Sequence, residues 1–247
     1  MVKKVSIIIP TYNEAQNIAP LLTQINTVIA LLQDYQVTIV VADDSSPDDT
    51  ADIVQSLTHT FTNIRLLSGP KEGMGAAYMR TIPTLLMSSD IIITMDADFS
   101  HPPHMIPQFL NTIHQGWDVV IGSRYIEGGK TVNWPLSRQI TSFLANFLAR
   151  TLGGLHTVHD CTSSYRAIRT SLLKEIPLDS LSTRGYAFAI ASLWEYIQND
   201  ANICEIPLIF IDRTLGATKL RLTDIIEYVV TCLILGVRSF INNIVNQ

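Results

Sequence analysis

Short apolar runs alternate with longer stretches of helical periodicity through the first half of the chain. The runs are rich in Val and Ile, as buried parallel strands are, and they are residues 5–9, 36–42, 63–68, 90–95 and 118–122. Between them, apolar residues recur at helical spacing over residues 13–32, after residue 46, at 76–87 and at 107–115. This order predicts an α/β fold: a Rossmann-like, mostly parallel sheet with helices on both faces.

The helix that follows residue 46 has a clear start signal. The run Ser46-Pro-Asp-Asp-Thr50 offers a Ser cap, a Pro in the first turn and two acids near the positive end of the helix dipole. It predicts that the helix begins at Ser46.

The second half is less regular. Helical spacing covers residues 136–152, 172–176 and 188–198, and a strand is predicted over 203–211. The glycines at 153 and 154 end the first of these helices. No repeat or linker interrupts the chain, so we expect one large domain over residues 1–224 and a separate C-terminal helix over 225–247.

The last apolar block, residues 225–241, decides how the chain meets a membrane. It is interrupted by Glu227 and Arg238 and is shorter than the roughly 20 apolar residues of a spanning helix. Two interpretations fit it equally well. It forms an amphipathic helix that lies at a membrane surface, or it packs on the domain or on another subunit.

Composition limits the class of partner. Hydrophobic residues make up 47% of the chain and the net charge is −5, which fits an apolar partner and excludes general nucleic-acid binding. Residues 1–120 carry a net charge of −7 and residues 121–247 a net charge of +2, which suits cations in the first half and anions in the second. Three dispersed cysteines and the lack of a signal-peptide pattern fit a reducing cytoplasm.

Asp96 and Asp98 follow the central apolar run directly. Ligands of open α/β sheets bind at the carboxyl ends of the strands. Carboxylate oxygens there suit Mg²⁺ or Mn²⁺ held against a phosphate. We therefore predict a metal and diphosphate site. Either both carboxylates converge on the cation, or one of them binds a ribose.

Two other strands end in polar residues. The run Pro10-Thr-Tyr-Asn-Glu14 follows the first strand, where Tyr12 can stack on a base or ribose and Glu14 can accept a hydrogen bond. The alternative is a helix start capped by Asn13 or Glu14. Asp43 and Asp44 end the second strand. Adjacent carboxylates repel each other, so at least one needs a hydrogen-bonding or cationic partner, unless the pair is only a solvated turn.

Cations follow later in the chain. Arg124 comes directly after a strand, so its guanidinium can reach a phosphate from the sheet edge. Arg213 and Lys219 flank a glycine and predict a loop that grips phosphate, with an ordinary basic surface loop as the alternative. The His101–His104 pair and the run from His156 to Cys161 look metal-like, but we interpret both as loops.

These motifs occur in a recognisable order. PTYNE, GMGAAY, MDADFSHPP, GSRY and DRTLGATKL over roughly residues 5–225 resemble the family 2 glycosyltransferases with a GT-A fold. The likeness is greatest to the dolichyl-phosphate (polyprenol-phosphate) mannosyltransferases. The resemblance implies that residues 1–224 are a GT-A domain. It also implies metal-dependent, inverting transfer of mannose from GDP-mannose to a polyprenyl phosphate.

The resemblance also implies roles for individual residues. It implies catalytic roles for Asp98, Arg124 and Arg213. Metal binding falls to Asp96, Asp98 and, through water, Ser100, with Mg²⁺ or Mn²⁺ as the cofactor. The residues implied for the nucleotide sugar are Pro10, Tyr12, Glu14, Ala42, Asp44, Asp96, Ala97, Asp98, Arg124, Arg213 and Lys219. Arg138 and Ser142 are the candidates for the acceptor phosphate. The chain departs from the family at Ala217-Thr218, where Glu-Ser is usual.

Several alternatives remain open from the sequence. A glucosyltransferase that uses UDP-glucose and a family 2 enzyme with a soluble acceptor share the same motifs, and a non-catalytic subunit is a further reading. We expect a cytoplasmic protein at the cytoplasmic face of a membrane. It would be held there by its C-terminal helix, its lipid substrate, self-association or an anchoring subunit.

Overall fold

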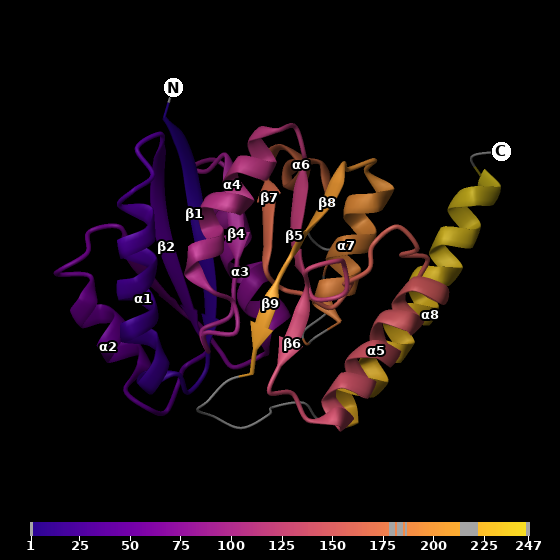
Figure 1. The fold of residues 1–247 in the computed structure, drawn as a ribbon, viewed down its shortest axis with the longest axis horizontal. Helices are drawn as coiled ribbons and strands as arrows, with labels where there is room; N and C mark the ends of the chain where they lie inside the picture. Colours follow the sequence, from indigo (N-terminus) through magenta and orange to yellow (C-terminus); the bar gives the residue numbers. More distant parts are fainter. Residues whose placement is uncertain (1, 178–180, 182–184, 186, 213–221, 246–247) are drawn as a thin grey trace.

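A seven-stranded sheet runs through the centre of the molecule in the order β3-β2-β1-β4-β7-β5-β8 (Figure 1). This computed structural model describes residues 2–177, 181, 185, 187–212 and 222–245. Neighbouring strands are parallel except that β7 is antiparallel to β4 and β5. The strands are β1 (Lys3–Thr11), β2 (Tyr35–Asp43), β3 (Ile64–Ser68), β4 (Ile91–Thr94), β5 (Val119–Ser123), β7 (Arg166–Arg169) and β8 (Ile203–Pro207).

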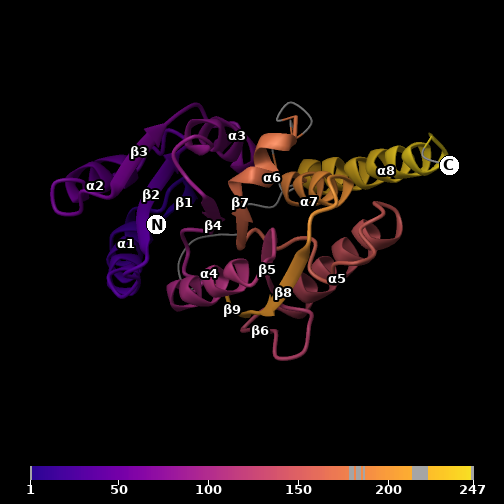
Figure 2. The same ribbon diagram turned by 90° about the horizontal axis from the view of Figure 1, so that it is seen from above.

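Helices cover both faces of this sheet (Figure 2). One face packs against α1 (Ala15–Ile29), α2 (Thr50–Leu57) and α4 (Ile106–His114), with the short 3-10 turn η1 (Pro103–Met105) beside them. The other packs against α3 (Met74–Leu85), α6 (Thr170–Glu175) and α7 (Phe188–Gln198). Ile7 and Ile9 enter one core and Ile8 enters the other, because successive strand side chains point to opposite faces. The predicted α/β, Rossmann-like fold is confirmed.

The predicted strand over residues 203–211 is wrong in one respect, because it is two strands. After β8 the chain enters a small second sheet, where β9 (Ile209–Ile211) pairs in parallel with β6 (Lys130–Val132). Pro207 has no N–H to continue the ladder. Leu208 is fully buried and donates its N–H to the carbonyl of Ser123 at 2.8 Å. The sequence analysis predicted neither β6 nor β7.

The start predicted for α2 at Ser46 is also wrong. The helix begins at Thr50, with Asp49 in the N-cap position. Ser46 instead donates its N–H and its hydroxyl to the carboxylate of Asp43, at 2.9 and 2.6 Å. Ser46 therefore bonds to the buried Asp43 and does not cap the helix as the local pattern had predicted.

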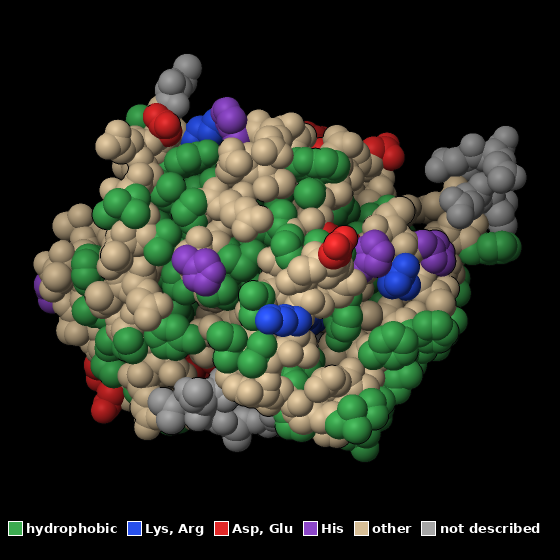
Figure 3. Space-filling view, in the orientation of Figure 1, with side chains coloured by type: hydrophobic (Ala, Val, Ile, Leu, Met, Phe, Trp, Pro, Cys, Tyr) green, Lys and Arg blue, Asp and Glu red, His purple; other side chains and the backbone are tan. Residues whose placement is uncertain are grey.

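Helices α5 (Leu136–Thr151) and α8 (Leu222–Val245) lie against each other at one end of the molecule (Figure 1). The Tyr228 hydroxyl of α8 donates to the carbonyl of Ala145 on α5 at 3.1 Å. Tyr228, Cys232 and Leu235 are buried, so one side of α8 packs on the domain, as one of the two predictions requires. The outer sides of both helices expose apolar side chains (Figure 3). None of the helices among the described residues has the length and apolar character that a membrane span needs.

Candidate functional site

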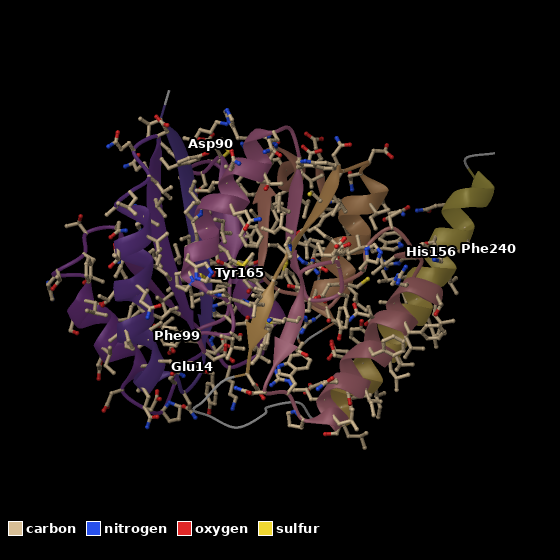
Figure 4. All side chains as sticks on the ribbon, in the orientation of Figure 1. Glu14, Asp90, Phe99, His156, Tyr165 and Phe240 are labelled. Carbon is tan, nitrogen blue, oxygen red and sulfur yellow. The ribbon has the colours of Figure 1, made fainter. Side chains whose placement is uncertain are left out.

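The carboxyl ends of β1, β2 and β4 meet at one edge of the sheet. In the strand register Thr11 lies beside Asp43, and Ile8 lies beside Thr94. Figure 4 shows Glu14, after β1, and Phe99, after β4, at this edge. The loops predicted to bind the nucleotide, the diphosphate and the metal are therefore neighbours.

Asp43 is completely buried at the end of β2. Its carboxylate accepts the hydroxyl of Thr11 at 2.8 Å, in addition to the two bonds from Ser46. These three hydrogen bonds hold the end of β2 in one conformation, so Asp43 has a structural role.

Asp44, the residue predicted to bind the nucleotide, is also buried. It forms an ion pair with Arg80 of α3, with Nη2 and Oδ1 2.9 Å apart, and accepts the N–H of Gly73 at 3.3 Å. A Cβ at Gly69 would lie 2.3 Å from Cζ of Arg80, so any larger residue at this position would have to displace the guanidinium that pairs with Asp44. The predicted partner for the acid pair is confirmed, and the solvated-turn alternative is wrong. No pattern in the sequence pointed to Arg80 as this partner.

The remaining nucleotide-side residues surround this acid pair. Pro10 pairs with the buried Ala42 across β1 and β2. Lys71 lies over the ring of half-buried Tyr12, with Nζ 3.6 Å from the centroid. Glu14 occupies the N-cap position of α1 but makes no side-chain capping bond. Its carboxylate instead accepts the amide of Asn17 at 2.9 Å.

The Asp-x-Asp turn after β4 is tied to its surroundings by serine and histidine. Asp96 accepts the Ser164 hydroxyl at 3.0 Å and donates its backbone N–H to Nδ1 of His101 at 2.8 Å. Asp98 accepts the N–H and the hydroxyl of Ser100, at 3.1 and 2.5 Å. The Asp96 side chain is 33% exposed, so it remains open to a ligand.

The donor set of this turn can be tested against a divalent cation. Ala97, between the two acids, is buried, and Ser100 is buried with its hydroxyl on Asp98. Within the described ranges, no three His, Cys, Asp or Glu side chains gather as a metal cage. Mg²⁺ is usually held by one or two carboxylates together with substrate phosphates. The residues therefore fit a cation that is shared with a bound diphosphate.

Arg124 is buried at the end of β5 in a bidentate pair with Asp160. Its Nε and Nη2 each lie 2.7 Å from a carboxylate oxygen, and Nη2 also donates to Thr162 at 2.6 Å. Burial opposes the charge on Asp160, but the Arg124 guanidinium and several hydrogen bonds outweigh it and lower the pKa of that carboxyl. The sequence placed Asp160 in a loop and gave it no role.

Two arginines share one pair of aromatic rings. Trp134 and Phe210 pack edge to face with centroids 5.1 Å apart. Cζ of Arg124 lies 5.2 Å and Cζ of Arg138 4.3 Å from the Trp134 centroid, both within cation–π range. Arg138 also forms an ion pair with Asp212.

The predicted acceptor residues therefore lie beside Arg124. Ser142 is one turn after Arg138 on α5, and its hydroxyl is 2.8 Å from that of Tyr125, the residue after Arg124. The structure thus brings both predicted acceptor residues close to the β5 tip. The other two predicted cations, Arg213 and Lys219, lie outside the described residues.

Comparisons with known proteins agree with this geometry. Residues 6–177 match Glycosyl transferase family 2. The polyprenol monophosphomannose synthase of Mycolicibacterium smegmatis is 35% identical over 224 residues, covering 90% of this chain and 82% of that protein. The undecaprenyl-phosphate mannosyltransferase of Micrococcus luteus is 34% identical, over 88% of this chain and 87% of its own. The dolichol-phosphate mannosyltransferase of Pyrococcus furiosus is 34% identical, over 91% of this chain but 61% of its own.

A solved structure shows the same fold. The glucosyl-3-phosphoglycerate synthase of Mycobacterium tuberculosis, bound to Mn²⁺, UDP-glucose and phosphoglyceric acid, superposes with a TM-score of 0.68. It is 21% identical, over 94% of this chain and 79% of its own. From its sequence matches and its fold, this chain belongs to glycosyl transferase family 2.

Proposed function

We propose that the protein transfers mannose from GDP-mannose to a polyprenyl phosphate with inversion at the anomeric carbon. The carrying observation is that the Asp-x-Asp turn and the Arg124–Arg138 cluster belong to one domain whose relatives are named for this type of transfer. The acids suit the diphosphate side of the donor, and the arginines suit the phosphate of the acceptor.

The reaction needs little proton chemistry from the protein. An anionic oxygen of the acceptor phosphate attacks the anomeric carbon, and the bond from that carbon to the diphosphate oxygen breaks with its electron pair on the leaving group. That acceptor oxygen carries no proton near neutral pH, so no general base is needed. One displacement inverts the configuration, and catalysis rests on alignment and charge stabilisation.

Asp96 and Asp98 would hold a divalent cation, Mg²⁺ or Mn²⁺, with Ser100 acting through water. When bound, such a cation neutralises charge on the leaving diphosphate. The bonds from Ser164 and Ser100 would hold the two carboxylates in place for it. The Mycobacterium tuberculosis enzyme of the same fold binds Mn²⁺ together with UDP-glucose, which supports this role.

The remaining roles are those that the family resemblance implies, and for the described residues their position supports them. Pro10, Tyr12, Glu14, Ala42, Asp44 and Ala97 would line the nucleotide. Arg124 and Arg213 would stabilise the charge that develops in the transition state, and Lys219 would bind the donor phosphates. Arg138 and Ser142 would hold the acceptor phosphate.

The α5–α8 face gives the lipid substrate a place to approach. We define this face by its exposed apolar side chains, which are Leu136, Ile140, Phe143, Leu144 and Phe147 of α5 and Ile225, Ile226, Val230, Leu233, Ile234, Val237, Phe240 and Ile241 of α8. So large an apolar surface is rare on a monomer without a partner. Helix α5 carries Arg138 and Arg150 and no acid, which favours an anionic surface.

We therefore place residues 1–224 as the transferase domain and residues 225–247 as part of a contact with the cytoplasmic membrane surface. Because Arg138 and Ser142 lie on α5 itself, an acceptor phosphate there would keep its polyprenyl tail next to this face. A second copy of the chain or an anchoring subunit on the same face would be the competing occupants.

A transfer assay tests the chemistry. The protein is incubated with Mg²⁺ or Mn²⁺, radiolabelled GDP-mannose or UDP-glucose, and a short polyprenyl phosphate, and label is counted in the organic phase. Mannose in that phase is the expected result. Labelled glucose alone in the organic phase would identify UDP-glucose as the donor. No lipid product, with nucleotide sugar still bound, would point to a soluble acceptor or a non-catalytic subunit.

Vesicle flotation tests the membrane contact. We expect the wild type to float with anionic phospholipid vesicles and the double variant Phe143→Glu/Phe147→Glu to stay behind. Leu31→Glu is the matched control, because Leu31 is 80% exposed on a different part of the surface. Equal flotation of all three proteins, or a stable dimer in size-exclusion chromatography, would contradict the proposal.

A further inference from the structure

The Asp-x-Asp turn contains a strained residue. Phe99, directly after Asp98, has a φ of 63°, in the left-handed region that bulky side chains rarely adopt. Strained backbone of this kind persists only where surrounding contacts over-determine it. The question is therefore which contacts hold the turn.

His101 lies behind the turn and makes the contact that closes it. Nδ1 accepts the N–H of Asp96 at 2.8 Å, and Nε2 lies 3.8 Å from Oδ2 of the same residue. The imidazole is 2% exposed and stacks on Tyr165 with centroids 4.7 Å apart. The edge of Phe210 closes another side at 5.8 Å. Figure 4 shows Tyr165, the residue before β7, near the centre of the fold.

The hydrogen bond from the N–H of Asp96 determines which ring nitrogen of His101 carries the proton. A backbone N–H can only donate, so Nδ1 is the unprotonated acceptor and the proton of the neutral ring is on Nε2. That Nε2–H faces the Asp96 carboxylate. A single side chain thus holds the backbone of Asp96 and faces its carboxylate, without being a metal ligand itself.

We infer that His101 is the positioning residue of the Asp-x-Asp pair, keeping Asp96 and Asp98 preformed for a divalent cation and the donor diphosphate. The inference rests on the proposed function. Groups that orient metal-binding carboxylates typically contribute 10–100-fold to metal affinity or activity. His101 acts through Asp96 and touches no reacting atom.

Two substitutions distinguish the contribution of Nδ1 of His101 from that of Nε2. His101→Asn can place its amide oxygen near the Nδ1 position and keep the bond to the N–H of Asp96. His101→Gln reaches the Nε2 position and loses that bond. His104→Gln is the matched control, because it makes the same change three residues along the same turn at an exposed side chain.

Binding of Mn²⁺ in the presence of GDP, and separately of UDP, is measured from the electron paramagnetic resonance signal of free Mn²⁺. We expect His101→Gln to weaken binding about 10–100-fold. His101→Asn should lose less than His101→Gln, and His104→Gln should match the wild type. Equal Mn²⁺ binding by all four proteins would overturn the inference.

Two further readouts keep the test decisive. If melting shows that His101→Gln fails to fold, ¹⁵N NMR of histidine in the wild type decides, because the inference requires the Nε2–H tautomer with Nδ1 as acceptor. The opposite tautomer would overturn it. If the wild type fails to bind Mn²⁺ in the presence of either GDP or UDP, the proposed metal site is overturned. If His101→Gln binds Mn²⁺ as tightly as the wild type does, only the positioning role is overturned.

Discussion

The acidic and the cationic halves of the site are built in different ways. Asp43 ends a buried strand, and Asp96 and Asp98 follow another. Residues three, five and two positions further along the chain contact them, and Thr11 and Ser164 from distant segments also bond to Asp43 and Asp96. Arg124 and Arg138 are instead held by acids 36 and 74 residues away. Asp43, Asp96 and Asp98 each have at least one partner close to them in the chain, whereas the acid partners of the two arginines come only from distant segments.

This difference has a consequence for function and stability. The Asp96 side chain is 33% exposed, so its carboxylate can be altered with little effect on packing. Arg124 is buried against Asp160, Trp134 and Phe210, so its charge is part of the core. Substitutions at Asp96 should lower activity alone, and substitutions at Arg124 should lower activity and stability together.

The largest effect is expected in the acidic half. Asp98→Ala should lower transfer by roughly 10³-fold or more, since metal stabilisation of the leaving group contributes several kcal/mol. The transfer assay measures the loss, and thermal melting should show a fold close to that of the wild type. Near-normal turnover in this variant would contradict the metal assignment.

Arg124→Ala should lower both the unfolding free energy and the transfer activity. It leaves the fully buried Asp160 carboxylate without its partner, which costs about 3–5 kcal/mol of unfolding free energy in comparable pairs. Urea unfolding measures this, and transfer should fall as well. The double variant Arg124→Leu/Asp160→Leu should recover stability but not activity. Recovery of both would show that Arg124 has no role in transfer.

Arg138→Ala should separate binding from stability. The Arg138–Asp212 pair is partly exposed, at 28% and 19%, so its loss should change the unfolding free energy by less than about 1 kcal/mol. The KM for polyprenyl phosphate should rise about 10-fold, because a charged hydrogen bond to phosphate is lost. Lys174→Ala, an exposed cation on α6, is the control. An unchanged KM would remove Arg138 from the acceptor site.

A further effect is expected in the acid range. Because the folded-state pKa of Asp160 is lowered, its stabilising charge is fully present above the unfolded value of about 3.9 and is lost as pH falls below it. The wild type should therefore lose unfolding free energy below about pH 4. Asp160→Asn should be less stable at pH 7 and show a shallower loss on acidification. Parallel pH profiles for the two proteins would contradict this linkage.

The sequence predicted that Asp43, Asp96 and Asp98 lie at strand ends, because the signals for strand ends are local. An apolar run that ends in acids marks a strand tip, and parallel strands bring their tips together. The same local logic failed at Ser46, because the buried Asp43 competes for that serine and delays the start of α2. The strand ends were therefore predictable, and one of the helix starts was not.

The cationic half could not be predicted because no local pattern encodes it. Strand β7 contains Arg166, which is buried and donates to the carbonyls of Cys161 and Ala189. Because a charged residue is not expected in a core strand, the sequence pattern did not predict β7. Trp134 has no sequence signal that places it between two arginines. The contact of Arg166 with Ala189, and the contacts of those two arginines with Phe210, join segments far apart in the chain and follow from tertiary packing.

The most direct test of the central claim is the configuration of the product formed by the wild type. GDP-α-mannose, Mg²⁺ and a short polyprenyl phosphate are incubated with the protein, and the lipid product is analysed by NMR. A single displacement by the acceptor phosphate predicts a β-linked mannosyl phosphate. An α-linked product, or the absence of lipid-linked mannose, would contradict the account.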